Sequence, residues 1–348
     1  MPIPKPGNYF FLVPIVALVP WYGMLMAMLI CWAGQGHPLY AFMDPEDKQN
    51  VVYISDIGAT NLNPLFIACA GWQGLFYVVT VACEFYQRSG YWPFRLRANY
   101  KTSADDGSTS ELSVNTMKSQ YSEMLASARF LMPPWYTRDE RNLIFASFVN
   151  GLIGELALLF CSIFTTAKYH TVHITMVVIF IIFLFFSVCC NIAEYMVMGR
   201  HYALLHPLAF QGTGSQPVTI DQLKWYQWRG HVWNKFTISG VSKIVWLIFA
   251  IVWAICFAAI DDDSKSACFE WLLAFWLGLY FIMLSIDFYF GGRYKKSRYF
   301  QHVQSFSGYY KYDEFLASTN FHHVSIPDEG EEVVIHDAEP VSMRAVVV

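Results

Sequence analysis

Six ionisable side chains lie inside long apolar stretches of this 348-residue chain, where an uncompensated charge is costly. They are Glu84, Glu155, Glu194, Lys243, Glu270 and Asp287. Groups of this kind pair with one another, hold a proton or line a route for a polar ligand. They are therefore the first candidates for chemistry in this sequence.

Four ionisable residues are expected at one depth. A helical rise of about 1.5 Å per residue places them roughly 6 to 10 Å inside the same boundary. They are Glu84, Glu194, Lys243 and Asp287. One lysine cannot pair with three carboxylates, so at least one carboxyl group is protonated, hydrated or hydrogen-bonded to a neighbour such as Asn191. This layer is either a structural clamp between helices or part of a cavity for a lipid headgroup or a proton.

Glu155 is predicted to lie deeper than this layer, with no cation at its level. Asn150 precedes it by five residues and is a second polar side chain in the same apolar stretch. A structural role and a transport role both stay open for this pair, and a hydrophilic groove reaching Glu155 would favour transport.

Two histidines are the residues that could indicate an enzyme. His170 and His173 are three residues apart at the outer end of the third and fourth apolar runs, and a metal-dependent hydrolase acting on lipid could use such a pair. The sequence contains no HExxH, no GxSxG and no glycine-rich phosphate loop. We therefore expect no catalytic residues, no metal and no cofactor.

The elements that carry these residues follow from composition. The chain is 55% hydrophobic and only 14% charged, unlike a soluble domain. Six apolar runs, each long enough to cross about 30 Å of hydrocarbon, are predicted as helices. They cover about residues 10–34, 64–87, 142–167, 172–198, 236–260 and 268–292. The predicted fold class is all-α, a polytopic membrane protein with a bundle of six transmembrane helices.

Lysine and arginine predict the orientation of the bundle. Most of the 23 basic residues lie in the N-terminus, the 88–141 loop, the 199–235 loop and the tail from residue 293. Basic segments stay on the cytoplasmic side, so both termini are predicted to be cytoplasmic. The opposite loops contain Asp56 and the run Asp261 to Asp263, which makes the outer face acidic.

The two longest segments outside the spans, 88–141 and 293–348, are predicted to be cytoplasmic. The 88–141 insertion is expected to contain a short surface helix near residues 111–131, and the 293–348 tail is basic and then acidic and disordered. Four cations follow the last span, and they would attract phosphatidylserine and phosphoinositides at about 1 kcal/mol per charge. They are Arg293, Lys295, Lys296 and Arg298. Retention on the cytoplasmic side would explain the same cations without a dedicated lipid site.

Two stretches resemble a known family. The first is YISDIGATNLNP, residues 53–64, in which Asn63 or Thr60 can cap a helix and Pro64 suits its first turn. The second is SACFEWLLAFWLGLYFIMLSIDF in the last apolar run. Together they resemble the Frag/DRAM/Sfk family of six-span proteins, and the long loop and tail look most like its fungal Sfk branch. This family also includes the N-terminal part of a fungal protein that remodels the lipid of GPI anchors.

The resemblance implies a function. It implies a non-enzymatic plasma-membrane regulator that supports a phosphatidylinositol 4-kinase complex and affects lipid distribution between leaflets. The expected partners are anionic inner-leaflet lipids and this kinase complex, and no nucleic acid is expected. The alternatives are a lipid transporter or scramblase-like protein, a lipid-modifying enzyme, or an autophagy modulator of the vacuolar or lysosomal membrane.

The same two stretches predict an outer polar site. Both would reach the outer boundary of the bundle, so their polar residues are expected to share neighbours there. The predicted residues are Tyr53, Ser55, Asp56, Gly58, Glu270 and Trp271.

Overall fold

The computed structural model describes residues 8–43, 49–89, 93, 131–133, 135, 138–204 and 233–293, and within these ranges its regular elements are all helices. They are α1 (Leu12–Gly34), α2 (Ile54–Gly58), α3 (Asn63–Ser89), α5 (Arg138–Ile163), α6 (Thr166–Leu204), α7 (Lys235–Ala259) and α8 (Asp263–Gly291). Among the described residues, six of these helices are long and apolar enough to cross a membrane. The predicted fold class, a polytopic bundle of membrane-spanning helices, is confirmed.

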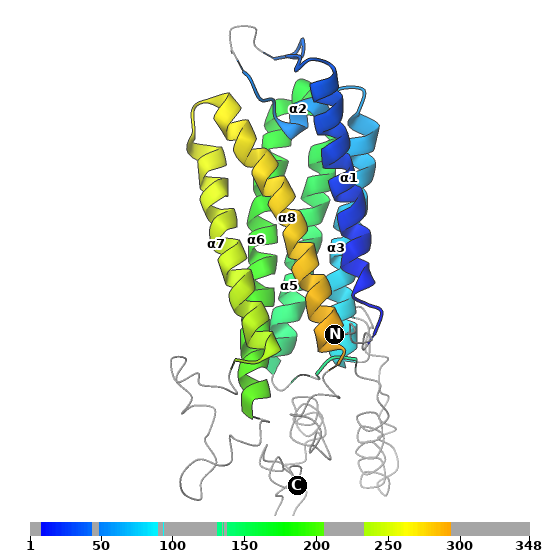
Figure 1. Ribbon diagram of the computed structural model, residues 1–348, viewed down its shortest axis with the longest axis vertical. Helices are drawn as coiled ribbons and strands as arrows, with labels where there is room; N and C mark the ends of the chain where they lie inside the picture. The colour runs from blue at the N-terminus through cyan, green and yellow to red at the C-terminus, as the bar shows by residue number, and fades with distance from the viewer. Residues whose placement is uncertain are drawn as a thin grey trace, which may run out of the picture.

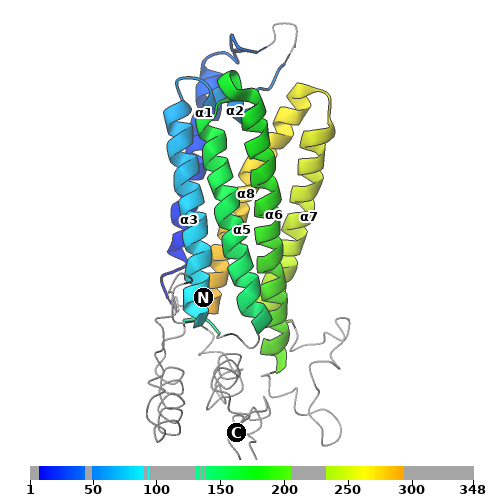
Figure 2. The same ribbon diagram turned by 180° about the vertical axis from the view of Figure 1, so that it is seen from behind.

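The six long helices form a closed ring. Each packs against its neighbours along the chain, α1 with α3, α3 with α5, α5 with α6, α6 with α7 and α7 with α8, and α8 returns to pack against α1. Successive helices run in opposite directions, so α1 begins at the same end at which α8 finishes (Figures 1 and 2). We call this the basic end, and the opposite end, which carries α2, the acidic end. That the basic end is cytoplasmic stays a prediction.

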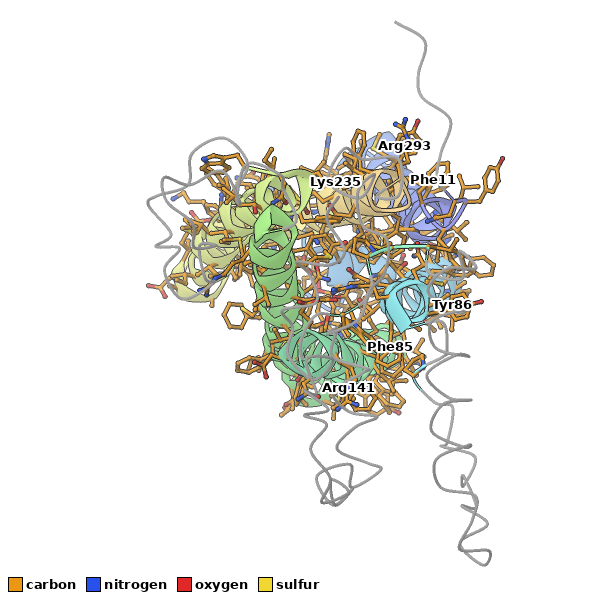
Figure 3. All side chains as sticks on the ribbon, turned by 90° about the horizontal axis from the view of Figure 1, so that it is seen from below. Phe11, Phe85, Tyr86, Arg141, Lys235 and Arg293 are labelled. Atoms are coloured by element: carbon orange, nitrogen blue, oxygen red, sulfur yellow. The ribbon has the colours of Figure 1, made fainter. Side chains whose placement is uncertain are left out.

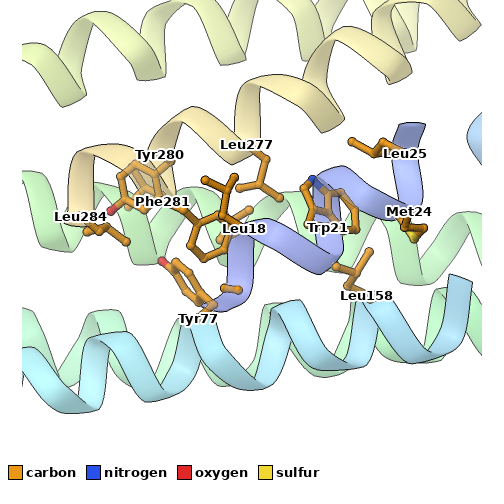
Figure 4. Packing of buried hydrophobic residues seen from close by; sticks show 14 of the residues in the cluster. Leu18, Trp21, Met24, Leu25, Tyr77, Leu158, Leu277, Tyr280, Phe281 and Leu284 are labelled. Carbon is orange, nitrogen blue, oxygen red and sulfur yellow. The ribbon is translucent and has the colours of Figure 1, made fainter. Parts of the chain in front are cut away.

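Aromatic residues fill the centre of the ring. Leu18 and Trp21 of α1 face Leu277 and Phe281 of α8, as Figure 4 shows. Trp21 Nε1 donates to the carbonyl oxygen of Ala274 at 2.8 Å. In a bilayer, a polar ring group needs a partner inside the protein, and this bond provides it while the ring fills the core.

The outward faces of the helices are also apolar. Val19, Ile30, Leu75 and Ile255 are all more than half exposed at 57–64%. A soluble protein could not expose so many large apolar side chains, whereas hydrocarbon solvates them. Helices that are apolar on every side indicate a bundle surrounded by lipid.

Several helices extend beyond the predicted spans, including α5 and α8 at their starts. α3 continues to Ser89, which places Arg88 inside the helix, although the sequence prediction assigned it to the 88–141 loop. α6 continues to Leu204 and is interrupted near its start, where Tyr169 has non-helical backbone angles. The predicted helix near 111–131, most of the 199–235 loop and the tail beyond residue 293 lie outside the described residues.

Candidate functional site

A chain of hydrogen bonds crosses the bundle near the basic end. Lys243 Nζ of α7 lies 2.7 Å from Asp287 Oδ2 of α8 and donates to Asn191 Oδ1 of α6 at 2.6 Å. Asn191 Nδ2 then donates to Glu84 Oε2 of α3 at 3.0 Å. The structure therefore brings together three of the four residues predicted for this layer, with Asn191 between Glu84 and the ion pair.

Two tyrosines line the same network. Tyr280 donates its hydroxyl to Asn191 Oδ1 at 3.1 Å. Lys243 Nζ lies 3.4 Å from the centre of the Tyr195 ring, close enough for a cation–π contact. Lys243, Tyr195 and Tyr280 are almost completely buried.

Glu194, the fourth residue of the layer, pairs with a cation that the sequence prediction missed. The guanidinium group of Arg88 binds both Glu194 and Glu140, and its Nε donates to the carbonyl oxygen of Pro133 at 2.9 Å. All three charged side chains are fully buried. The sequence signal was the spacing of Glu84 and Arg88, which at four residues apart lie on one helix face.

Glu155 lies in the interior of the bundle and is 4% exposed. Its Oε1 accepts a hydrogen bond from Gln73 Nε2 of α3 at 3.1 Å. Asn150 turns away, is partly exposed and donates to the carbonyl oxygen of Ala146 on its own helix at 2.8 Å. The partner of Glu155 thus comes from the neighbouring helix, which no pattern within one helix could indicate.

At the acidic end, α8 holds the short helix α2. Glu270 Oε2 accepts the backbone N–H of Ile54 at 2.6 Å. Trp271 Nε1 donates to the carbonyl oxygen of Val52 at 3.0 Å, and the Tyr53 hydroxyl donates to Asp263 Oδ1 at 3.1 Å. The structure therefore brings the two stretches together, because side chains of α8 satisfy the backbone that begins α2.

Asp56 caps α2 from within. It is the third residue of α2 and 8% exposed, and its carboxylate accepts the N–H of Tyr53, the residue before the helix. Burial raises the pKa of Asp56 to about 6, the Tyr53 N–H lowers it, Asp263 adds to the rise and His170 opposes it. This carboxyl group is therefore poised to change charge in mildly acidic surroundings.

Gly58 and Ser55 complete this region. A Cβ atom on Gly58 would lie 2.6 Å from the Phe66 ring, so the close approach of α2 to α3 requires glycine. Ser55 borders a cavity of about 190 Å³ that is lined mainly by residues of α6, α7 and α8. Its other polar neighbours are Glu270 and His173, and its walls are otherwise mainly apolar and aromatic. In a bilayer, such a cavity can hold hydrocarbon.

The two histidines lie in different surroundings. His173 is buried, and its Nδ1 donates to the carbonyl oxygens of Cys161 at 2.9 Å and Phe164 at 3.0 Å. His170 is exposed and contacts Thr166 Oγ1 at 3.2 Å. Among the residues with described positions, no three histidine, cysteine or acidic side chains converge as metal ligands would.

The cations after the last span are described only in part. Arg293 is the last described residue, and Lys295, Lys296 and Arg298 lie outside the described ranges. Lys235, at the start of α7, lies at the same end of the bundle, as Figure 3 shows, and was not among the predicted lipid-binding residues.

Comparison with known proteins gives two matches. A family model described as "Frag1/DRAM/Sfk1/Cwh43P N-terminal domain" matches residues 9–290. The chain is 61% identical over 339 residues to Protein SFK1 of Saccharomyces cerevisiae, covering 95% of this chain and 92% of that protein. No solved structure matches the chain. Both matched regions include the basic-end network and the α2–α8 contact.

Proposed function

Because the chain belongs to the Frag1/DRAM/Sfk1 family, we propose that it is a non-enzymatic integral membrane regulator of phosphoinositide metabolism. Its proposed partner is a phosphatidylinositol 4-kinase complex, and its proposed location is the plasma membrane. The observation that carries this proposal is the near full-length similarity to Protein SFK1, which joins the chain to the branch of the family that the sequence features had indicated.

The interior of the bundle supports a scaffold. Lys243 is bound by Asp287 and Asn191, and Arg88 is bound by Glu140 and Glu194. Charges that satisfy one another across helices fix how the helices pack, and removing one partner leaves a costly buried charge. A rigid bundle of this kind suits a protein that holds a cytoplasmic partner at the membrane.

A lipid-transport function is the second candidate. The mainly apolar cavity of about 190 Å³ lined by α6, α7 and α8 favours it, because a transporter must hold part of a lipid. Glu155 argues against a polar route through the bundle, since it is enclosed and bound by Gln73. The regulatory function remains our proposal.

The test is proximity labelling in cells with the intact protein and with a variant in which Arg293, Lys295, Lys296 and Arg298 are replaced by glutamine. We expect the variant to lose kinase-complex neighbours and plasma-membrane location, because these cations follow the last span and would bind anionic lipid. The control neutralises the same number of charges in the acidic tail, at Asp328, Glu329, Glu331 and Glu332.

Kinase neighbours that persist in the basic-tail variant at wild-type level would contradict a role for these cations. An intact protein without kinase neighbours would contradict the regulatory function itself.

A further inference from the structure

The cavity beside α2 is elongated. It follows α6 from His173 to Val188 and α7 from Trp246 to Phe257. At about 1.5 Å per residue, the shorter of these two stretches is about 16 Å long. One leaflet of a bilayer has a similar depth, about half of the roughly 30 Å hydrocarbon core. A volume of about 190 Å³ spread over this length makes the cavity narrow, so its shape suits a single alkyl chain.

The polar groups of this cavity gather at one end, near the acidic end of the bundle. Ser55 belongs to α2, Cys161 lies near the end of α5, and His173 and Glu270 lie near the starts of α6 and α8. The remaining wall is apolar or aromatic. Every tryptophan of the wall already donates its N–H to a backbone carbonyl oxygen. A ligand therefore finds its hydrogen-bonding groups at one end and hydrocarbon along the rest.

Three side chains at the polar end can accept hydrogen bonds. The Ser55 hydroxyl group has no hydrogen-bond partner among the described residues. His173 is 2% exposed and donates from Nδ1 to two backbone carbonyl oxygens, so Nε2 carries a lone pair, with the Cys161 sulfur 3.6 Å away. Glu270 Oε2 accepts the Ile54 N–H, and a carboxylate can accept further bonds. The ligand that suits these groups is a hydrogen-bond donor.

The charge at this end is negative and lacks a cation. Glu270 forms no ion pair with any described residue, and no described residue of the wall is lysine or arginine. Lys265, on the same helix, is paired instead with Asp262 at 3.0 Å. Asp56 adds negative charge beside Glu270, which the exposed His170 offsets when it is protonated. A buried carboxylate is stabilised by a nearby cation, so this end favours a cationic head over a phosphate or a carboxylate.

We propose that this cavity binds a single-chain lipid with a cationic amine head. Its ammonium group has three N–H donors, which would bind Glu270, Ser55 and His173. Its alkyl chain would lie between α6 and α7 in the direction of Trp246, and its head would supply the cation that Glu270 lacks. This site needs neither a kinase nor a particular orientation of the bundle, so it goes beyond the proposed regulatory function.

The test uses the full-length protein in phosphatidylcholine vesicles that contain a trace of a long-chain amine with a photoreactive diazirine in its chain. We expect photolysis to label the peptides of α6, α7 and α8 that line the cavity, as identified by mass spectrometry. Unlabelled octadecylamine should compete about tenfold more effectively than octadecanol, because a hydrogen bond to a charged group is worth about this factor. Octadecanoic acid, with the same chain and a negative head, should compete least.

Two pairs of variants test the head and the chain separately. Glu270→Gln keeps an oxygen for the Ile54 N–H and removes the charge, so octadecylamine should lose its advantage over octadecanol. Asp261→Asn, exposed at the same end, should retain this advantage. Ala254→Phe fills the cavity and should abolish the labelling, whereas Ala258→Phe on the exposed face of α7 should leave it unchanged.

Three outcomes would overturn the proposed site. Equal competition by octadecylamine and octadecanol in the intact protein would show that the charge of the head is not recognised. An amine preference that persists in Glu270→Gln would remove Glu270 from the site. Labelling that Ala254→Phe leaves unchanged would place the photoreactive amine in the bilayer and outside the cavity.

If Glu270→Gln does not fold, the competition series in the intact protein and the Ala254→Phe variant still decide the result. The assay contains no kinase, so its outcome is independent of the proximity-labelling experiment.

Discussion

At the scale of single residues, the polar side chains of this protein act in pairs that join different helices. Lys243 binds Asp287, Arg88 binds Glu194 and Gln73 binds Glu155. Buried polar groups need such partners because little water is present to replace them. These residues therefore determine how the helices are rotated and paired.

Asp56 provides a prediction at this scale. Its pKa in the folded protein is about 6, above the ordinary value of 3.8, so its contribution to stability is complete below about pH 3.8 and is lost as pH rises through 6. The loss amounts to at most about 3 kcal/mol. Asp56→Asn should remove this part of the pH dependence while keeping an oxygen for the Tyr53 N–H.

Thermal unfolding of the purified protein in detergent, followed across this pH interval, measures the effect. The matched control is Asp261→Asn, because Asp261 is exposed at the same end of the bundle. This substitution should leave the change of unfolding temperature with pH as in the wild type. If the unfolding temperature of Asp56→Asn changes with pH as steeply as that of the wild type, Asp56 is not the group responsible for this pH dependence.

At the scale of elements, close approach between helices depends on small residues. The Tyr22 ring of α1 lies against Gly278 of α8, and its hydroxyl donates to the carbonyl oxygen of Phe275 at 2.8 Å. A Cβ atom on Gly278 would lie 2.2 Å from the Tyr22 ring. The contact that closes the ring between the first and last helices therefore has no room for a methyl group.

Gly278→Ala should reduce the free energy of unfolding by about 1–3 kcal/mol, the usual cost of overpacking. Gly23→Ala is the control, since a Cβ atom there would meet nothing within 4 Å and alanine favours helix. Thermal unfolding of the two variants in the same detergent measures the difference. Equal unfolding temperatures would contradict the tight α1–α8 contact.

The element scale also explains how the short helix α2 is held in the fold. α2 is only five residues long, too short to be stable alone. Asp56 caps it from within and Glu270 from α8, so its order comes from the tertiary contact. The short polar stretch that precedes α3 is thus ordered by its contact with α8.

At the scale of the whole molecule, the six spans found among the described residues give a prediction about topology. α1 begins and α8 ends at the basic end, so epitope tags at the two termini should be accessible from the same face of the membrane. The positive-inside rule predicts that this face is cytoplasmic. Protection of tags in sealed cells, compared with permeabilised cells, tests it.

A tag placed after Asp261, between α7 and α8, serves as the control and should be accessible from outside. Terminal tags that are accessible in sealed cells would contradict the orientation, and with it the proposed contact between the basic end and the anionic leaflet.

The sequence alone determined the six long helices and the depth of their charged residues. Helix length and rise are local properties, so an apolar run of sufficient length and the position of Glu84 or Lys243 along it can be counted directly. The resemblance of residues 53–64 and of the last apolar run to one family also indicated that family before any contact between the two stretches was known.

Only the tertiary structure decided which side chains meet. The helices are apolar on both their inner and outer faces, so periodicity does not reveal how each is rotated about its axis. For that reason the sequence prediction assigned Arg88 to a loop and missed Lys235. It also paired Glu155 with Asn150, whereas the partner of Glu155 in the structure is Gln73. The packing of neighbouring helices fixes these rotations, because the buried polar groups find their partners on adjacent helices and not on their own.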